Sequence, residues 1–172
     1  MVSGKSPAGA THLNAMRRYQ YLTQAMVELE DGRPDTVQLT LAPLEPYVQN
    51  CARIIDGIHL NVLTAIALRR KKDERWRERL TAALDAAAEY RFIRTVSVYG
   101  TAVLPLLEAL DWDGDKAWRK RLMAAVRTQA AFYPHFLEPR LAPGEELTPR
   151  SCKFSICSAR TSPTPRSRRS WM

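Results

Sequence analysis

Apolar residues that recur every three or four positions are the feature that most constrains how this chain can fold. Met16, Tyr19, Leu22, Met26 and Leu29 have this spacing, which places them on one face of an α-helix. Five further segments repeat the spacing, and their predicted inward-facing residues are Val37, Leu41, Leu44 and Val48; Ile54, Ile58, Val62, Ala65 and Ile66; Trp76, Leu80, Ala83, Leu84 and Ala87; Val96, Val103, Leu106, Leu107 and Leu110; and Trp118, Leu122, Val126, Gln129 and Phe132. The pattern predicts an all-α fold with six helical segments.

Residues that end or bend helices separate these segments. The stretch DGRP (31–34) is expected to end the first helix, because glycine suits a left-handed cap and proline cannot continue the hydrogen-bond ladder. Pro43 and Pro46 should kink or split the second segment. Because Gly100 and Pro105 both disfavour a regular helix, the sequence does not decide whether the first part of the fifth segment, residues 92–110, is helical.

The six helices form three pairs that repeat along the chain. Their first members begin near residues 14, 53 and 94, and this period of about 40 residues is typical of repeats built from helical hairpins. One hairpin cannot bury its apolar face alone, so the pairs should stack, with Ala65, Ala83 and Ala87 at close crossings. We therefore predict antiparallel helix hairpins stacked as a tetratricopeptide-like array over residues 13–138, after a disordered N-terminus at 1–12 and before a linker at 139–149.

The excess of positive charge lies at the C-terminal end. Residues 1–149 carry 20 Lys and Arg and all 18 acids, so they give no case for a phosphate-binding face. Residues 150–172 contain no acid, and this composition predicts a disordered basic tail that cannot bury enough apolar surface to order itself. The alternative is a nucleic-acid arm made by Arg166, Arg168 and Arg169.

Cysteine usage and hydropathy indicate a cytoplasmic protein with no membrane partner. An odd set of Cys51, Cys152 and Cys157 suits a reducing compartment and makes no disulfide framework. No apolar run approaches the roughly 20 residues of a spanning helix. The start, MVSGKSPAGATHLNAMRR, has no apolar segment of the signal-peptide kind.

We find no pattern of catalytic, cofactor-binding, metal or DNA-binding residues, and we expect no enzyme. A nucleophile–base pair is missing, as is the phosphate loop G-x-x-x-x-G-K-[ST]. The three histidines (His12, His59, His135) lie far apart, and Cys152 and Cys157 lack further zinc ligands. DWDGD (111–115) faintly resembles a calcium loop but has no bidentate glutamate, so a turn whose aspartates cap the backbone is preferred.

Other candidate positions have ordinary structural interpretations. RRKK (69–72) is expected to be a solvated helix end, where cations favour the helix dipole, and a partner contact is the minority alternative. Asp73 should cap the next helix and pair with Arg77. Trp76 and Trp118 occupy matching places in their helices, and core packing is preferred there over ligand stacking.

The stretch from 53 to 110 contains two longer motifs. A helix of the "LxLLxAIAL" kind is matched by Leu60, Leu63, Ala65, Ala67 and Leu68. After a charged turn, "AxxxLxxALxxAxxxGFxRxFxxxGxxLxxLL" is matched by Trp76, Leu80, Ala83, Leu84, Ala87, Tyr90-Arg91-Phe92, Arg94, Gly100 and Leu104 to Leu107. These motifs resemble the tetratricopeptide-like sensor region of MalT-type regulators in the LuxR family, and the resemblance covers roughly residues 13–147. The corner AAEYRFIRTVSVYGTAVLPLL carries it most specifically.

In that family, a helix-turn-helix domain follows the repeats and opens with "LTPRE", an apolar helix and "SNxEIA". EELTP (145–149) matches the opening, but no helix-turn-helix follows. Reading each codon of the tail from its third base permits an apolar "LQILxLL" pattern at 151–158 and "DKSNAEIAEIMD" from Arg160 onward. We therefore hypothesise that residues 150–172 are an out-of-frame peptide or reflect a sequence or assembly error.

The resemblance implies a truncated sensor and scaffold region of a transcriptional regulator, without its ATPase and DNA-binding modules. Its helical groove is the expected place for a small-molecule inducer or a protein partner, although the sequence does not identify the groove residues. DNA would be bound only through the lost helix-turn-helix. The alternative is a stand-alone tetratricopeptide-type adaptor for protein interactions.

Overall fold

The computed structural model describes residues 15–140 of the 172-residue chain. The helices in this part are α1 (Ala15–Glu30), α2 (Pro34–Leu41), α3 (Leu44–Asn50), α4 (Ile54–Arg70), α5 (Trp76–Glu89), α6 (Ile93–Ser97), α7 (Gly100–Ala109) and α8 (Lys116–Phe132). There is no strand among the described residues, so the predicted all-α fold is confirmed. None of these helices is long and apolar enough to span a bilayer.

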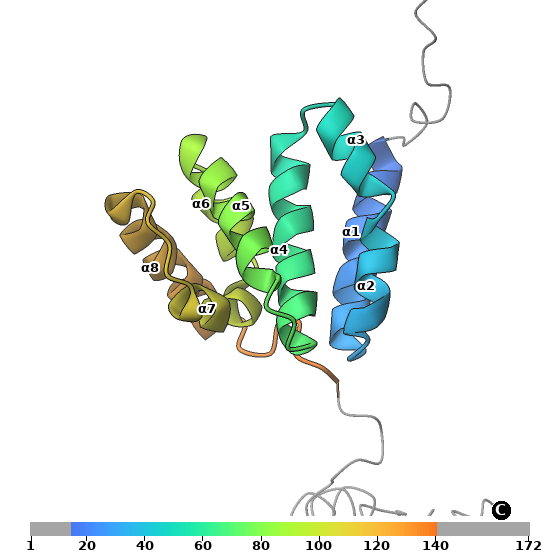
Figure 1. The fold of residues 1–172 in the computed structure, drawn as a ribbon. Helices are drawn as coiled ribbons and strands as arrows, with labels where there is room; N and C mark the ends of the chain where they lie inside the picture. Colours follow the sequence, from blue (N-terminus) through green and yellow to red (C-terminus); the bar gives the residue numbers. More distant parts are fainter. Residues whose placement is uncertain (1–14, 141–172) are drawn as a thin grey trace, which may run out of the picture. The chain divides into compact units, whose positions relative to one another are not determined.

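The helices pair in chain order as three hairpins (Figure 1). α1 packs against α2, α4 against α5, and α7 against α8. The short helix α6 also packs against α8, and the short helix α3 packs against α4. Neighbouring hairpins join through α4, which contacts α2 and α3 on one side and α6 and α7 on the other. The hairpins begin at Ala15, Ile54 and Ile93, so their starts lie 39 residues apart, close to the predicted period.

Four of these helices end with the same turn. At Gly32, Ala52, Lys72 and Arg91 the backbone is left-handed, with φ of 69°, 47°, 59° and 58°. In each turn, the next residue donates its backbone N–H to the carbonyl five residues earlier, as from Arg33 to Glu28 at 2.8 Å and from Asp73 to Leu68 at 3.0 Å. These bonds satisfy carbonyls that the helix end leaves free, as in a Schellman motif. The turn therefore recurs about every 20 residues and ends the first four helical arms.

Prolines divide the second arm of the first hairpin, as the sequence predicted. α2 ends at Leu41 and α3 begins at Leu44, so Pro43 lies in the break. Pro46 lies in the first turn of α3, where an N–H would have no partner within the helix.

Gly100 marks the second break, between α6 and α7. Its φ is 38°, and a Cβ there would lie 3.2 Å from the backbone nitrogen of Ala130 in α8. Glycine is therefore needed both for the backbone conformation and for the close approach of α7 to α8. Pro105 lies inside α7 and has no N–H to donate to the carbonyl of Thr101.

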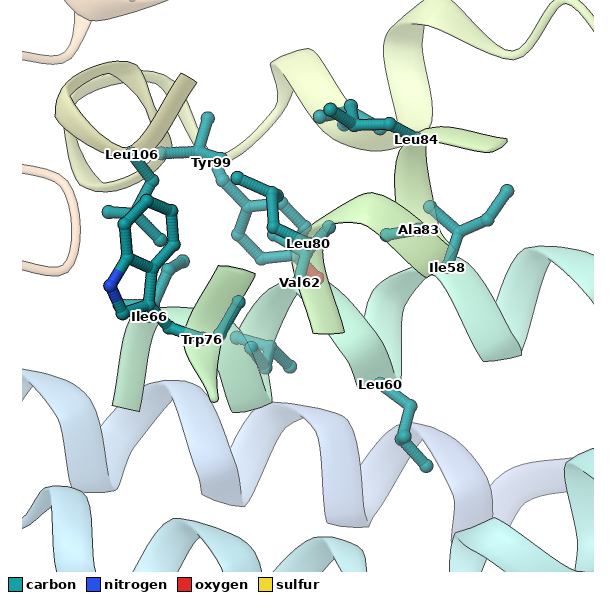
Figure 2. Packing of buried hydrophobic residues seen from close by; sticks show 14 of the residues in the cluster. Ile58, Leu60, Val62, Ile66, Trp76, Leu80, Ala83, Leu84, Tyr99 and Leu106 are labelled. Carbon is teal, nitrogen blue, oxygen red and sulfur yellow. The ribbon is translucent and has the colours of Figure 1, made fainter. Parts of the chain in front are cut away.

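The core is continuous through all three hairpins, and α4 lies at its centre. Figure 2 shows side chains of α4 and α5 in this core together with Tyr99 and Leu106. Ten of the seventeen residues of α4 are buried, more than one helical face, because helices cover it on two sides. Trp76, Tyr99 and Trp118 are among the largest fully buried side chains. Core packing is therefore confirmed for both predicted tryptophans. Ala65, Ala83 and Ala87 are also fully buried, as expected.

Two residues predicted to face inward are exposed. Tyr19 is 56% exposed because the buried face of α1 consists of Leu22, Ala25 and Leu29 and continues to Arg18. The guanidinium of Arg18 lies 3.5 Å from the carboxylate of Asp56 in α4. Phe132 is 76% exposed because it is the last residue of α8, where the chain leaves the core.

The predicted pairing of Asp73 with Arg77 is wrong. Asp73 instead accepts from the backbone and guanidinium of Arg75, and Arg77 pairs with Glu74 at 2.8 Å. Residues 73–76 form a tight turn, so α5 begins only at Trp76. The ion pairs here therefore form between residues two or three positions apart and not four. Asp73 therefore holds the turn before the helix and is not its N-cap.

Candidate functional site

The segment 133–140 after α8 folds back against the ends of earlier helices. Leu137, although its neighbours Glu138, Pro139 and Arg140 are exposed, is itself fully buried. Its φ is 59°, a left-handed conformation that is uncommon for a bulky residue. We call residues 133–140 the exit segment, because the chain leaves the described helices through it.

Arg70, the last residue of α4, ties the exit segment to the first hairpin. Its guanidinium donates to the backbone carbonyl of Leu29 at 2.6 Å and to that of Leu137. Burial lowers the pKa of Arg70, and Glu138 partly opposes this effect. The predicted solvated helix end is therefore wrong for Arg70, which is half-buried and joins residues far apart in the sequence.

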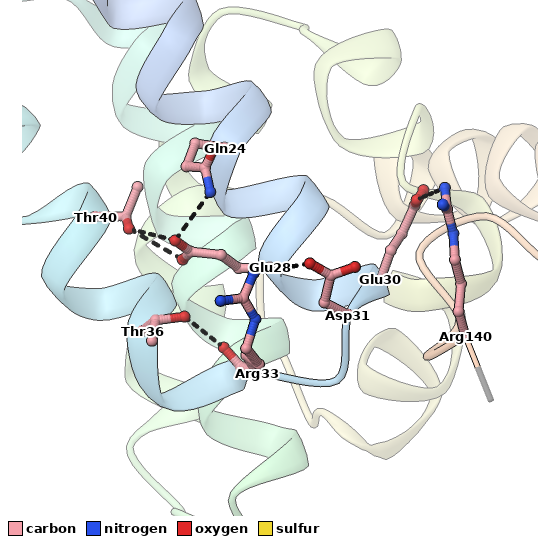
Figure 3. A network of polar contacts seen from close by, with 8 residues as sticks. All are labelled: Gln24, Glu28, Glu30, Asp31, Arg33, Thr36, Thr40 and Arg140. Atoms are coloured by element: carbon pink, nitrogen blue, oxygen red, sulfur yellow. Dashed lines mark hydrogen bonds and ion pairs between the residues drawn. The ribbon is translucent and has the colours of Figure 1, made fainter. Parts of the chain in front are cut away.

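Two further contacts hold the exit segment. Arg140 donates its backbone N–H to the carbonyl of Glu30 at 2.6 Å, and its guanidinium lies 2.5 Å from the Glu30 carboxylate (Figure 3). Thr101 in α7 donates its hydroxyl to the carbonyl of Tyr133 at 2.8 Å. All three hairpins thus contribute to fixing the exit segment.

A cavity of about 280 Å³ lies beneath this segment, between α4 and α7. Its walls are mainly apolar and include Ile66, Ala102, Pro105, Leu106, Phe136 and Leu137. The charged residues that line it are Arg69, Arg70 and Glu138. The cavity therefore combines an apolar interior with a charged rim.

Arg69 lies over the ring of Trp76, with its guanidinium carbon 5.3 Å from the ring centroid. Arg77 lies over the same ring at 4.7 Å, so two cations stack on one buried indole. The other two residues of the RRKK stretch do not line the cavity: Lys71 pairs with Asp35 at 2.8 Å, and Lys72 is exposed.

Outside this cavity, a polar cluster joins α1 to α2. The Glu28 carboxylate is buried and accepts from the Thr40 hydroxyl at 2.8 Å and the Gln24 amide at 3.3 Å (Figure 3). The cluster borders a wider groove of about 530 Å³, lined in part by Arg17, Tyr21 and Leu39. The sequence pattern did not predict this cluster, because the three polar residues stand at unremarkable spacings.

His59 in α4 contacts Tyr99. Its Nδ1 lies 2.7 Å from the hydroxyl of Tyr99, which burial holds protonated by raising its pKa. Burial also lowers the pKa of His59, and the nearby Asp56 opposes this effect. A hydrogen bond therefore joins the phenol and the imidazole, and the pair packs α4 against the start of α7.

The other positions singled out in the sequence make ordinary structural contacts or lie outside the described residues. Asp115 caps α8 by accepting from the backbone of Ala117 and Trp118, and it pairs with Arg91 at 2.6 Å, so the capping interpretation of DWDGD is confirmed. His135 contacts Glu138 at 2.8 Å. Within 15–140, no group of three or more potential ligands could hold a metal ion. His12, Cys152, Cys157, the tail arginines and the motif EELTP lie outside the described residues.

Comparisons with known protein families, with curated proteins and with solved structures found no match to this chain.

Proposed function

We propose that the helical array is the sensor and scaffold region of a transcriptional regulator similar to the MalT-type members of the LuxR family. One observation carries the proposal: EELTP (145–149) follows the last helix, which ends at Phe132, after a short connection, and the shifted frame behind it permits a helix-turn-helix sequence. The hairpins, with their 39-residue spacing, are the architecture that such a sensor region requires. The proposal places the protein in the cytoplasm and assigns it no catalytic role.

The exit segment gives this proposal a physical route for signalling. It leads toward EELTP and is held by contacts to all three hairpins. A change in how the hairpins pack would alter those contacts, and so would shift the population of docked exit segments. In a regulator, that shift would reach the DNA-binding domain.

Restoring the reading frame tests the proposal. The shifted frame after codon 149 is expressed in fusion with residues 1–149, and a random duplex library is selected for binding. We expect the restored protein to enrich one sequence, because a helix-turn-helix reads base edges in the major groove. Matched controls are residues 1–149 alone and the 172-residue chain. Enrichment no greater than that of residues 1–149 would count against the proposal.

A stand-alone adaptor is the second candidate, and the groove on α1 and α2 favours it. Leu39 at its edge is 76% exposed, which suits contact with a partner's apolar side chain. The genomic surroundings separate the two candidates. A regulator has ATPase and repeat codons upstream and helix-turn-helix codons downstream, whereas an adaptor has neither.

A further inference from the structure

Three features coincide at the cavity beneath the exit segment. The cavity is partly open to solvent, and its lining is mainly apolar. Leu137, which forms one wall, has a left-handed backbone that is costly for a side chain with a Cβ. Arg70, which forms another wall, holds a partly desolvated charge. Strain and burial of charge concentrated at one cavity point to a binding site.

The charged residues at the rim of the cavity indicate which charged group a ligand would carry. Arg70 already donates to two carbonyls, and the Glu138 carboxylate is engaged by His135. Arg69 is different, because no ion pair or hydrogen bond within residues 15–140 involves its guanidinium. Stacking on Trp76 nevertheless fixes its position beside the cavity. A preorganised guanidinium of this kind suits a carboxylate.

We propose that the cavity binds a small, mainly apolar molecule that carries one carboxylate group, with its apolar part against Ala102, Pro105 and Phe136 and its carboxylate facing Arg69. The volume of about 280 Å³ lies near the lower end for ligand pockets, which sets the size of the molecule. The biological role of this site, as the place where an inducer is sensed, rests on the proposed function. The binding itself does not.

Three probes with the same apolar chain test the class of ligand: hexanoate, hexan-1-ol and hexylammonium. Each is titrated into the full 172-residue chain while backbone amide shifts are followed by NMR. We expect hexanoate to bind with a dissociation constant of about 1 mM, which is within reach of so small a ligand. Its saturable shifts should centre on Ala102, Leu106 and Phe136. Hexan-1-ol should bind about threefold more weakly, because the exposed ion pair that it lacks contributes only a little to the affinity. Hexylammonium should bind more weakly still, because its charge has the same sign as that of Arg69.

Variants assign the binding to the cavity. Arg69→Gln should reduce the affinity for hexanoate to that for hexanol, and Arg69→Lys should restore part of the preference. Ala102→Phe should fill the cavity and abolish the binding of all three probes. Lys72→Gln is the matched control, since it removes a cation from the same helix end but does not line the cavity, and it should change nothing. Circular dichroism and thermal melting confirm that each variant folds.

The proposal is overturned if the three probes bind equally, if none saturates, or if the shifts lie elsewhere. A folded Ala102→Phe that still binds hexanoate would also overturn it. Failure of this site and failure of the regulator proposal are distinguishable. Hexanoate binding with no helix-turn-helix in the shifted frame would leave a ligand-binding array of another kind. A restored DNA-binding domain without hexanoate binding would leave a regulator that senses through a different surface.

Discussion

Left-handed residues end four of the helices, and only one of the four is glycine. At Lys72 the backbone has a φ of 59°, and the side chain is exposed. The Cβ costs about 1–2 kcal/mol in this conformation, whereas glycine has no such cost but loses more entropy on folding. Lys72→Gly should therefore stabilise the protein by about 0.5–1 kcal/mol, measured by urea unfolding.

Lys72→Ala is the control for that prediction, because it removes the charge and the long side chain but keeps the Cβ. It should leave the free energy of unfolding within about 0.5 kcal/mol of the natural protein. An equal gain from both substitutions would mean that the lysine side chain, and not the backbone conformation, is the source of the strain.

His59 makes the stability of the protein depend on pH. Burial lowers its pKa in the folded state from the ordinary value of 6.5, so below that pH the unfolded state takes up a proton that the folded state resists. The melting temperature should therefore fall as the pH drops from about 7.5 to about 5.5, a window above the ordinary pKa values of the carboxylates.

Two histidine variants separate this effect from others. His59→Gln should flatten the pH dependence in that window, while His135→Gln, at an exposed position, should retain it. An unchanged slope in His59→Gln would show that another group titrates.

At the scale of the elements, Arg70 connects α1, α4 and the exit segment. Arg70→Met keeps the apolar stem but removes two charge-assisted hydrogen bonds, and it should cost about 2 kcal/mol. Hydrogen exchange of the amides at 136–138 and 140 should accelerate. Arg140→Met breaks only an exposed ion pair and should cost at most about 1 kcal/mol. Equal exchange rates in Arg70→Met and the natural protein would contradict this role for Arg70.

The contact between α7 and α8 depends on Gly100. Gly100→Ala places a methyl group against the backbone of Ala130 and should cost roughly 1–3 kcal/mol in thermal or chemical unfolding. Gly57→Ala is the matched comparison, because its Cβ would meet only the movable Cγ1 of Val48 at 3.0 Å in an ordinary helix. It should change stability by no more than about 1 kcal/mol. The reverse order would indicate that α7 and α8 can separate without cost.

Local signals in the sequence predicted most of these elements. Apolar spacing identified the three hairpins, and Pro43 and Pro46 predicted the division between α2 and α3. The sequence did not predict which face Tyr19 presents, because the buried stripe of α1 includes an arginine that pairs across the fold. It also did not predict the cavity or the contacts of Arg70, since these join residues that are 41 and 67 positions apart.

For the whole molecule, we propose that this gene encodes the repeat region of a DNA-binding regulator. The apolar core extends through all three hairpins, whereas EELTP and the acid-free stretch after it lie beyond residue 140. The claim therefore depends on what the DNA encodes after codon 149.

The most direct measurement is an independent determination of the nucleotide sequence from codon 140 through the region beyond codon 172. We expect the frame that starts at the third base of each tail codon to encode an apolar helix followed by a sequence close to DKSNAEIAEIMD, and to continue as a helix-turn-helix. Stop codons in that frame, or no helix-turn-helix in any frame after codon 149, would contradict the proposal.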